Sequence, residues 1–140
     1  MNDPFAKMEY NKKSLLALFV QLAKADNRID ENEIEFIEQV RTKLGVEKEV
    51  LANIWINDDQ YPLNVPQSEK HRMTILHQLL ILMHIDGDVA VEEIQFVRHI
   101  GRSLRISNAL VEELISTVKA LEGEQLSVED ILKSIQKFLN

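Results

Sequence analysis

Apolar residues recur three or four positions apart through most of the chain, which is the spacing of amphipathic helices. A first long helix is predicted from Asn11 to Ala25, and its inward face is formed by Leu15, Leu18, Phe19 and Leu22. A second is predicted to start after Asp30, with Glu33 completing a capping-box pattern, and to stop at Gly45. Its inward stripe is predicted to comprise Ile34, Ile37, Val40, Arg41 and Leu44.

A third helix is predicted from Val46 to about Asn57, and the prolines and turn formers that follow indicate a linker over 58–67. The next helix, capped by Ser68 or Asn64 and ending at Ile85, is apolar on nearly every side between Met73 and Met83. Such a helix is buried on most sides, so we place it at the centre of the fold.

Three further helices complete the pattern. One is predicted from about Val91 to Leu104, and one after Ser107 that ends before Gly123. The last is predicted over 127–139, and a short opening helix is capped by Asp3. Alternation with period two is not sustained anywhere, so we predict a single all-α domain without a sheet.

The chain also contains an internal duplication. Identical residues return at one constant offset, without a gap, over roughly forty residues, which is typical of a repeated unit. The identical pairs are Leu16/Leu76, Leu22/Leu82, Asp26/Asp86, Glu33/Glu93, Ile34/Ile94, Phe36/Phe96 and Leu44/Leu104. Repeat one covers about 13–57 and repeat two about 68–121, and each reads as a helix, a tight acidic turn and a helix.

Composition narrows the function. The 140 residues contain no cysteine, which excludes disulfides and thiolate chemistry. The net charge is −7 and the sequence has no basic stripe, which disfavours nucleic acid and an anionic membrane. Charged residues interrupt the N-terminus, and no apolar run approaches the roughly 20 residues that span a bilayer. We therefore expect a soluble, cytoplasmic protein without direct membrane insertion.

The acidic turns are the candidate site. Asp26 and Asp86 follow the last turn of a helix, where a carboxylate faces the negative end of the helix dipole. A cation would reverse that unfavourable interaction. Glu33 and Glu93 open the following helix and point back toward the same turn. Carboxylates grouped with backbone carbonyls suit Ca²⁺ or Mg²⁺.

The two turns differ, which ranks the candidate ligands. Arg28 adds a positive charge to the first turn, whereas the matching residue Asp88 adds a carboxylate to the second. Ala90 replaces the polar cap found at Asp30. The second site is therefore the stronger, and the candidate ligands in order are Asp86, Asp88 and Glu93 with Glu92 in reserve, then Asp26, Asp30 and Glu33. Neither turn has the ligand spacing of an EF-hand loop.

A purely structural interpretation of the same residues stays open, because a glutamate in the first turn of a helix also caps the backbone. Other chemistry is weak. His77 and His84 lie about 10 Å apart along one helix, too far for one metal, and we expect them to be hydrogen-bonded or partly exposed. No catalytic triad or phosphate-binding loop is present, and we predict a protein that is not an enzyme.

The acidic turns resemble those of the TerB-like family of tellurite-resistance proteins. The resemblance is carried by Ala25-Asp26-Asn27-Arg28-Ile29-Asp30-x-x-Glu33 and Ile85-Asp86-Gly87-Asp88-Val89-x-x-x-Glu93. It implies an all-α domain of about seven to eight helices, with the two repeats related by a pseudo-two-fold. It also implies divalent-cation binding through Asp26, Glu33, Asp86 and Glu93.

Beyond the site, the resemblance implies a scaffold role in tellurite resistance or stress response, with protein partners that include a membrane-protein complex. Asn27 and Arg28 depart from the family's turn, which expects glycine after the aspartate. Two hypotheses follow. The chain is either a cation-binding scaffold or a metal-independent protein-interaction module whose acidic turns are structural helix caps.

Overall fold

The computed structural model describes residues 11–85 and 88–121, and all regular structure in that part of the chain is helical. The elements are α1 (Lys12–Lys24), α2 (Glu31–Leu44), α3 (Lys48–Ile56), the single 3₁₀ turn η1 (Asp58–Gln60), α4 (Glu69–His84), α5 (Val91–Ser103) and α6 (Asn108–Lys119). This confirms the all-α prediction. The opening helix and the helix predicted over 127–139 lie outside the described residues.

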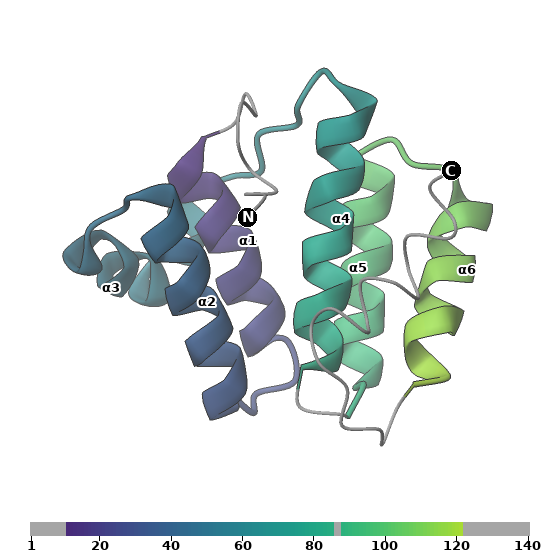
Figure 1. Cartoon of the computed structure of the whole chain (residues 1–140), viewed down its shortest axis with the longest axis horizontal. Helices are drawn as coiled ribbons and strands as arrows, with labels where there is room; N and C mark the ends of the chain where they lie inside the picture. The colour runs from purple at the N-terminus through teal and green to yellow at the C-terminus, as the bar shows by residue number, and fades with distance from the viewer. Residues whose placement is uncertain (1–10, 86–87, 122–140) are drawn as a thin grey trace.

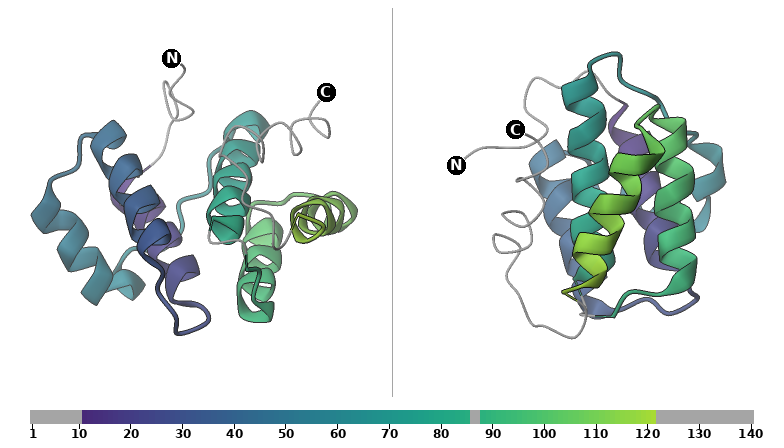
Figure 2. Two further views of the ribbon diagram at one scale, coloured as in Figure 1. Left: turned by 60° about the horizontal axis from the view of Figure 1, so that its bottom comes forward. Right: turned by 90° about the vertical axis from the view of Figure 1, so that its right-hand side faces the viewer.

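The helices are arranged as two hairpins that stand side by side. Figure 1 shows α1 and α4 running in the same direction, while α2 and α5 return antiparallel to them. Helix α3 packs chiefly on α1, and α6 packs on both α4 and α5. The turns after α1 and α4 therefore lie at the same end of the molecule, as the views in Figure 2 also show.

The core lies where α1 meets α4. Every residue from Leu15 to Val20 and from Leu79 to His84 is buried, and the burial of the end of α4 agrees with its all-apolar pattern. Phe19 of α1 meets Phe36 of α2 edge to face, with 6.2 Å between ring centroids. Among the described residues, no helix is both long and apolar enough to cross a membrane.

Local signals set most helix ends. The side-chain oxygen of Asn11 accepts hydrogen bonds from the N–H groups of Lys13 and Ser14 at the start of α1. Ser68 and Ser107 cap α4 and α6 in the same way. Gly45 ends α2 in the left-handed conformation, with φ of 71°. Each helix therefore begins or ends within a few residues of its predicted position.

The linker is tied to α1 rather than hanging free. Lys24 Nζ donates to Asp58 Oδ1 at 2.6 Å and to the carbonyl oxygen of Trp55 at 2.9 Å. Gln21 also donates to the carbonyl oxygen of Asp58. Within the linker predicted over 58–67, η1 forms one 3₁₀ turn.

The third helix of each half packs differently, and this changes the exposure of matched residues. Ile34 of α2 is 42% exposed, whereas its counterpart Ile94 of α5 is 6% exposed. Helix α5 packs against α1, α4 and α6, whereas α2 packs chiefly on α1 among the described helices. The assignment of Ile34 to the buried stripe was therefore wrong. Gly101 lets α5 and α6 approach closely, since a Cβ there would lie 2.7 Å from Cγ2 of Val111.

An ion pair reinforces the contact between α5 and α6. The guanidinium of Arg98 donates two hydrogen bonds of 2.8 Å to the two carboxylate oxygens of Glu112. These bonds lower the pKa of the Glu112 carboxyl. Both side chains are exposed, so the pair fixes orientation more than it stabilises the fold.

Candidate functional site

The first acidic turn is a hydrogen-bonded loop built on Asp26. Its Oδ1 accepts the backbone N–H of Arg28 at 3.0 Å, and Asn27 between them adopts φ of 62°. Asparagine tolerates that left-handed conformation better than most residues, which explains how the chain turns without glycine. The Asp26 carboxylate is thus already engaged by its own turn.

Two reciprocal hydrogen bonds open α2. Asp30 Oδ1 accepts from the N–H of Asn32 at 2.7 Å, and Glu33 Oε1 accepts from the N–H of Asp30 at 3.0 Å. Glu33 is only 2% exposed, so its carboxylate is held against the backbone inside the protein. The predicted capping box is confirmed, and it assigns a structural role to both carboxylates.

Only half of this arrangement exists at the start of α5. Glu93 Oε1 accepts from the N–H of Ala90 at 3.0 Å, and Glu93 is 3% exposed. Ala90 has no side-chain oxygen to cap the helix in return. The matched glutamates Glu33 and Glu93 thus accept the same backbone hydrogen bond in both repeats, and α5 lacks one capping hydrogen bond that α2 has.

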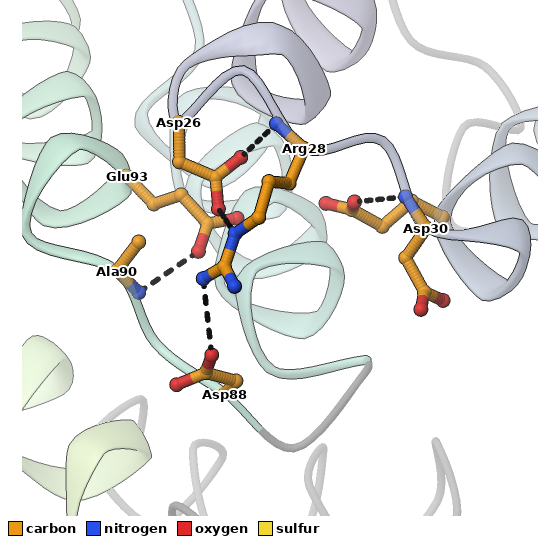
Figure 3. Close-up of polar contacts among 7 residues, drawn as sticks. Asp26, Arg28, Asp30, Asp88, Ala90 and Glu93 are labelled. Carbon is orange, nitrogen blue, oxygen red and sulfur yellow. Dashed lines mark hydrogen bonds and ion pairs between the residues drawn. The ribbon is translucent and has the colours of Figure 1, made fainter.

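Arg28 connects the two turns. Its Nη2 lies 3.4 Å from Asp88 Oδ2 in the other repeat, and its Nε lies 3.9 Å from Asp26 Oδ2. Figure 3 shows the guanidinium between these two carboxylates, with Glu93 beside them. The side chains of Arg28 and Asp88 are 74% and 63% exposed, so the contact is solvated and contributes little to stability.

The arrangement bears directly on the predicted cation site. Of the predicted ligands, Asp86 lies outside the described residues, and Glu92 is exposed. Glu33 and Glu93 already bind backbone N–H groups, while Arg28 lies between Asp26 and Asp88. Within residues 11–85 and 88–121, no three histidine or acidic side chains form a group that could hold a metal ion. In this arrangement the described residues do not fit a divalent cation.

Two histidines of α4 are more buried than the sequence analysis expected. His84 is 1% exposed, and its Nε2 lies 2.6 Å from the carbonyl oxygen of Leu121. His77 is 6% exposed and its Nε2 has no hydrogen-bond partner, so the expectation that it is bonded or partly exposed was wrong. Burial lowers the pKa of His77 to about 4. The all-apolar pattern of α4 indicated this burial, because a helix without a solvent-exposed face leaves no exposed position for a histidine.

A surface feature emerges only from the fold. The end of the molecule that contains both turns is here called the acidic end. It is defined by the exposed residues Glu31, Glu35, Asp88 and Glu92 and by exposed Ile29, Ile34 and Val91, and exposed Arg28 lies among these carboxylates. Four large apolar side chains are exposed among the described residues, and three of them, Ile29, Ile34 and Val91, lie at this end. Ile34 was predicted to lie in the core, so this surface could not be predicted from the sequence.

Comparisons with known proteins add no relative to this picture. No protein-family model, curated protein or solved structure matches the chain.

Proposed function

We propose that the chain is a non-catalytic, metal-independent protein-interaction module that binds a basic, amphipathic segment of a partner protein at its acidic end. The observation that carries the proposal is the coincidence of exposed carboxylates with exposed Ile29, Ile34 and Val91 at one end of a rigid helical core. A partner with lysines or arginines beside apolar residues complements both features.

The buried glutamates support the same conclusion. Glu33 and Glu93 serve the backbone, and neither is available to a ligand without uncapping a helix. Uncapping costs about 0.5–2 kcal/mol of helix stability. The acidic turns are thus best explained as rigid supports that present Glu31, Asp88 and Glu92 to solvent.

A synthetic lysine-rich amphipathic peptide tests the proposal directly. Its binding is followed by fluorescence anisotropy in excess chelator, which removes any contribution of metal. The test variant is Glu31→Gln/Glu35→Gln/Glu92→Gln, which neutralises the acidic end. The matched control is Glu47→Gln/Glu49→Gln/Glu69→Gln, which removes the same charge from exposed residues near the starts of α3 and α4.

We expect the peptide to bind wild type and the control equally, and to bind the test variant at least about tenfold more weakly, a difference of roughly 1.4 kcal/mol. A second substitution pair, Ile29→Ser/Ile34→Ser, should weaken binding with no change of charge. Equal affinity for the test and control variants would show that net charge, and not the acidic end, drives the interaction.

Cation binding and the tellurite-resistance or stress-response role implied by the TerB-like resemblance stay predictions. The observation that keeps the cation hypothesis in view is that one guanidinium already bridges Asp26 and Asp88 of the two turns. Displacement of the solvated Arg28 side chain would have to precede any metal. Thermal melts with added cations test this second candidate.

A further inference from the structure

Opposite charges gather at the two ends of the helix bundle. The end opposite the acidic end, here called the basic end, contains the starts of α1 and α4 and the ends of α2 and α5. It is defined by the exposed residues Lys12, Lys13, Lys43, Lys70, Arg102 and Arg105, which outnumber exposed Glu69 at the start of α4. These residues are scattered along the sequence, and the two antiparallel hairpins bring them together.

Basic residues occur here even where a helix disfavours them. Lys12 and Lys13 occupy the first turn of α1, which contains no acidic residue. Cations at a helix N-terminus oppose the helix dipole, and each such placement costs about 0.3–1 kcal/mol at low ionic strength. An acidic surface docked on this end would offset that cost.

We propose that copies of this chain associate head to tail, with the acidic end of one copy against the basic end of the next. The proposal rests on the proposed function, because it names a second copy as the partner of the acidic end. The basic end matches the carboxylates of that surface by charge, and none of the residues that define it is apolar, so exposed Ile29, Ile34 and Val91 do not contribute to this contact. Its basis is charge complementarity between two surfaces of one molecule, each of which would repel the same surface of another copy. A symmetric dimer through either end alone would bring like charges together.

The net charge of −7 does not prevent this contact. Helix α4 has 16 residues and is therefore about 24 Å long, given a rise of about 1.5 Å per residue. Screening at about 0.1 M salt limits charge interactions to roughly 10 Å. The distant ends of two associated copies are thus screened from each other, and only the facing ends of opposite sign interact.

Because the two surfaces differ, the contact is heterologous, and repeated addition of copies gives rings or open chains. The association should weaken steeply with salt, since at about 1 M the screening length falls to roughly 3 Å.

Sedimentation velocity over a concentration series tests the inference with three proteins. They are wild type, the acidic-end variant Glu31→Gln/Glu35→Gln/Glu92→Gln, and the basic-end variant Lys43→Gln/Lys70→Gln/Arg102→Gln. All six positions are exposed, and circular dichroism checks that each variant is folded. We expect wild type to form concentration-dependent species larger than a dimer at about 0.1 M salt and to dissociate at about 1 M.

Each variant alone should associate at least tenfold more weakly than wild type. An equimolar mixture should restore association but stop at the heterodimer, because only one intact pair of ends remains. Wild type that stays monomeric at all concentrations overturns the inference, as does association that either variant leaves unchanged or a mixture that forms no heterodimer. A monomeric wild type that still binds the basic peptide overturns head-to-tail association while leaving the proposed function standing; loss of both overturns both.

Discussion

Buried His77 makes the stability of this protein depend on pH. In the folded chain its pKa is about 4, against 6.5 for a free histidine. The unfolded chain therefore binds more protons than the folded one between these values, and the free energy of unfolding falls as the pH drops through that window. Above pH 6.5 the imidazole is neutral in both the folded and the unfolded chain, so the free energy of unfolding does not depend on its protonation. Below pH 4 it is protonated in both states, and the decrease in the free energy of unfolding is complete.

The magnitude follows from the two pKa values. Their difference corresponds to about 3.4 kcal/mol at most, at about 1.36 kcal/mol per pKa unit. Over the accessible range from about pH 7 to about pH 5, the expected loss is about 2 kcal/mol. Because a domain of this size is stable by about 5–15 kcal/mol, such a loss is readily measured.

Urea unfolding of wild type and His77→Leu measures the effect. The leucine has similar volume and carries no polar atom, so it also removes the unpartnered Nε2. We expect the variant to be at least as stable as wild type at pH 7, and the gap to widen by about 2 kcal/mol at pH 5. Exposed His99 provides the control, since His99→Leu should leave the pH dependence of wild type unchanged. Parallel pH profiles for wild type and His77→Leu would refute the assignment of the low pKa to His77.

Three further predictions concern the helix starts, the contact between α5 and α6, and the ion pairs of Arg28 between the two turns. Ala90→Ser should raise the free energy of unfolding by about 1 kcal/mol, because the serine supplies the missing cap oxygen of α5, and Asp30→Ala should lower it by a similar amount at α2. Urea unfolding measures both changes. If Ala90→Ser gives no gain in stability, α5 does not lack a capping bond. Gly101→Ala should destabilise by about 1–3 kcal/mol through contact with Val111, and less in a Val111→Ala background, as double-mutant unfolding measures. Arg28→Gln should change the free energy of unfolding by less than about 1 kcal/mol, because the ion pairs of Arg28 are solvated. A larger loss of stability in a thermal melt would mean that the ion pairs between the two turns stabilise the fold.

Features encoded by neighbouring residues were predictable from the sequence. The capping box of Asp30 and Glu33, the stop at Gly45 and the cap Ser107 depend only on local backbone chemistry and lie where predicted. Ser68 caps α4 and is one of the two alternatives, Ser68 or Asn64, that the sequence offered. The buried α4 was equally clear, because a helix without a polar face has no other stable place.

Features that depend on packing between distant elements were not predictable. Ile34 and Ile94 occupy the same position in matching sequences, yet only Ile94 is buried. Among the described helices, α5 packs against α1, α4 and α6, whereas α2 packs chiefly on α1. Arg28 was expected to repel a cation within its own turn, whereas its guanidinium reaches Asp88 of the other repeat. The local sequence does not determine which turns lie at the same end of the molecule. The acidic and basic ends could therefore be identified only from the fold.

The most direct test of the central claim, that the acidic turns are structural and need no metal, is a thermal melt in chelator and then with Ca²⁺, Mg²⁺, Mn²⁺ or Zn²⁺. A cation at about 100 times its dissociation constant would stabilise the folded chain by about 2.7 kcal/mol, which raises the melting temperature by several degrees. We predict the same melting temperature under all conditions for wild type and for Asp88→Asn. A rise in wild type that disappears in Asp88→Asn would contradict the claim and identify the second turn as a cation site.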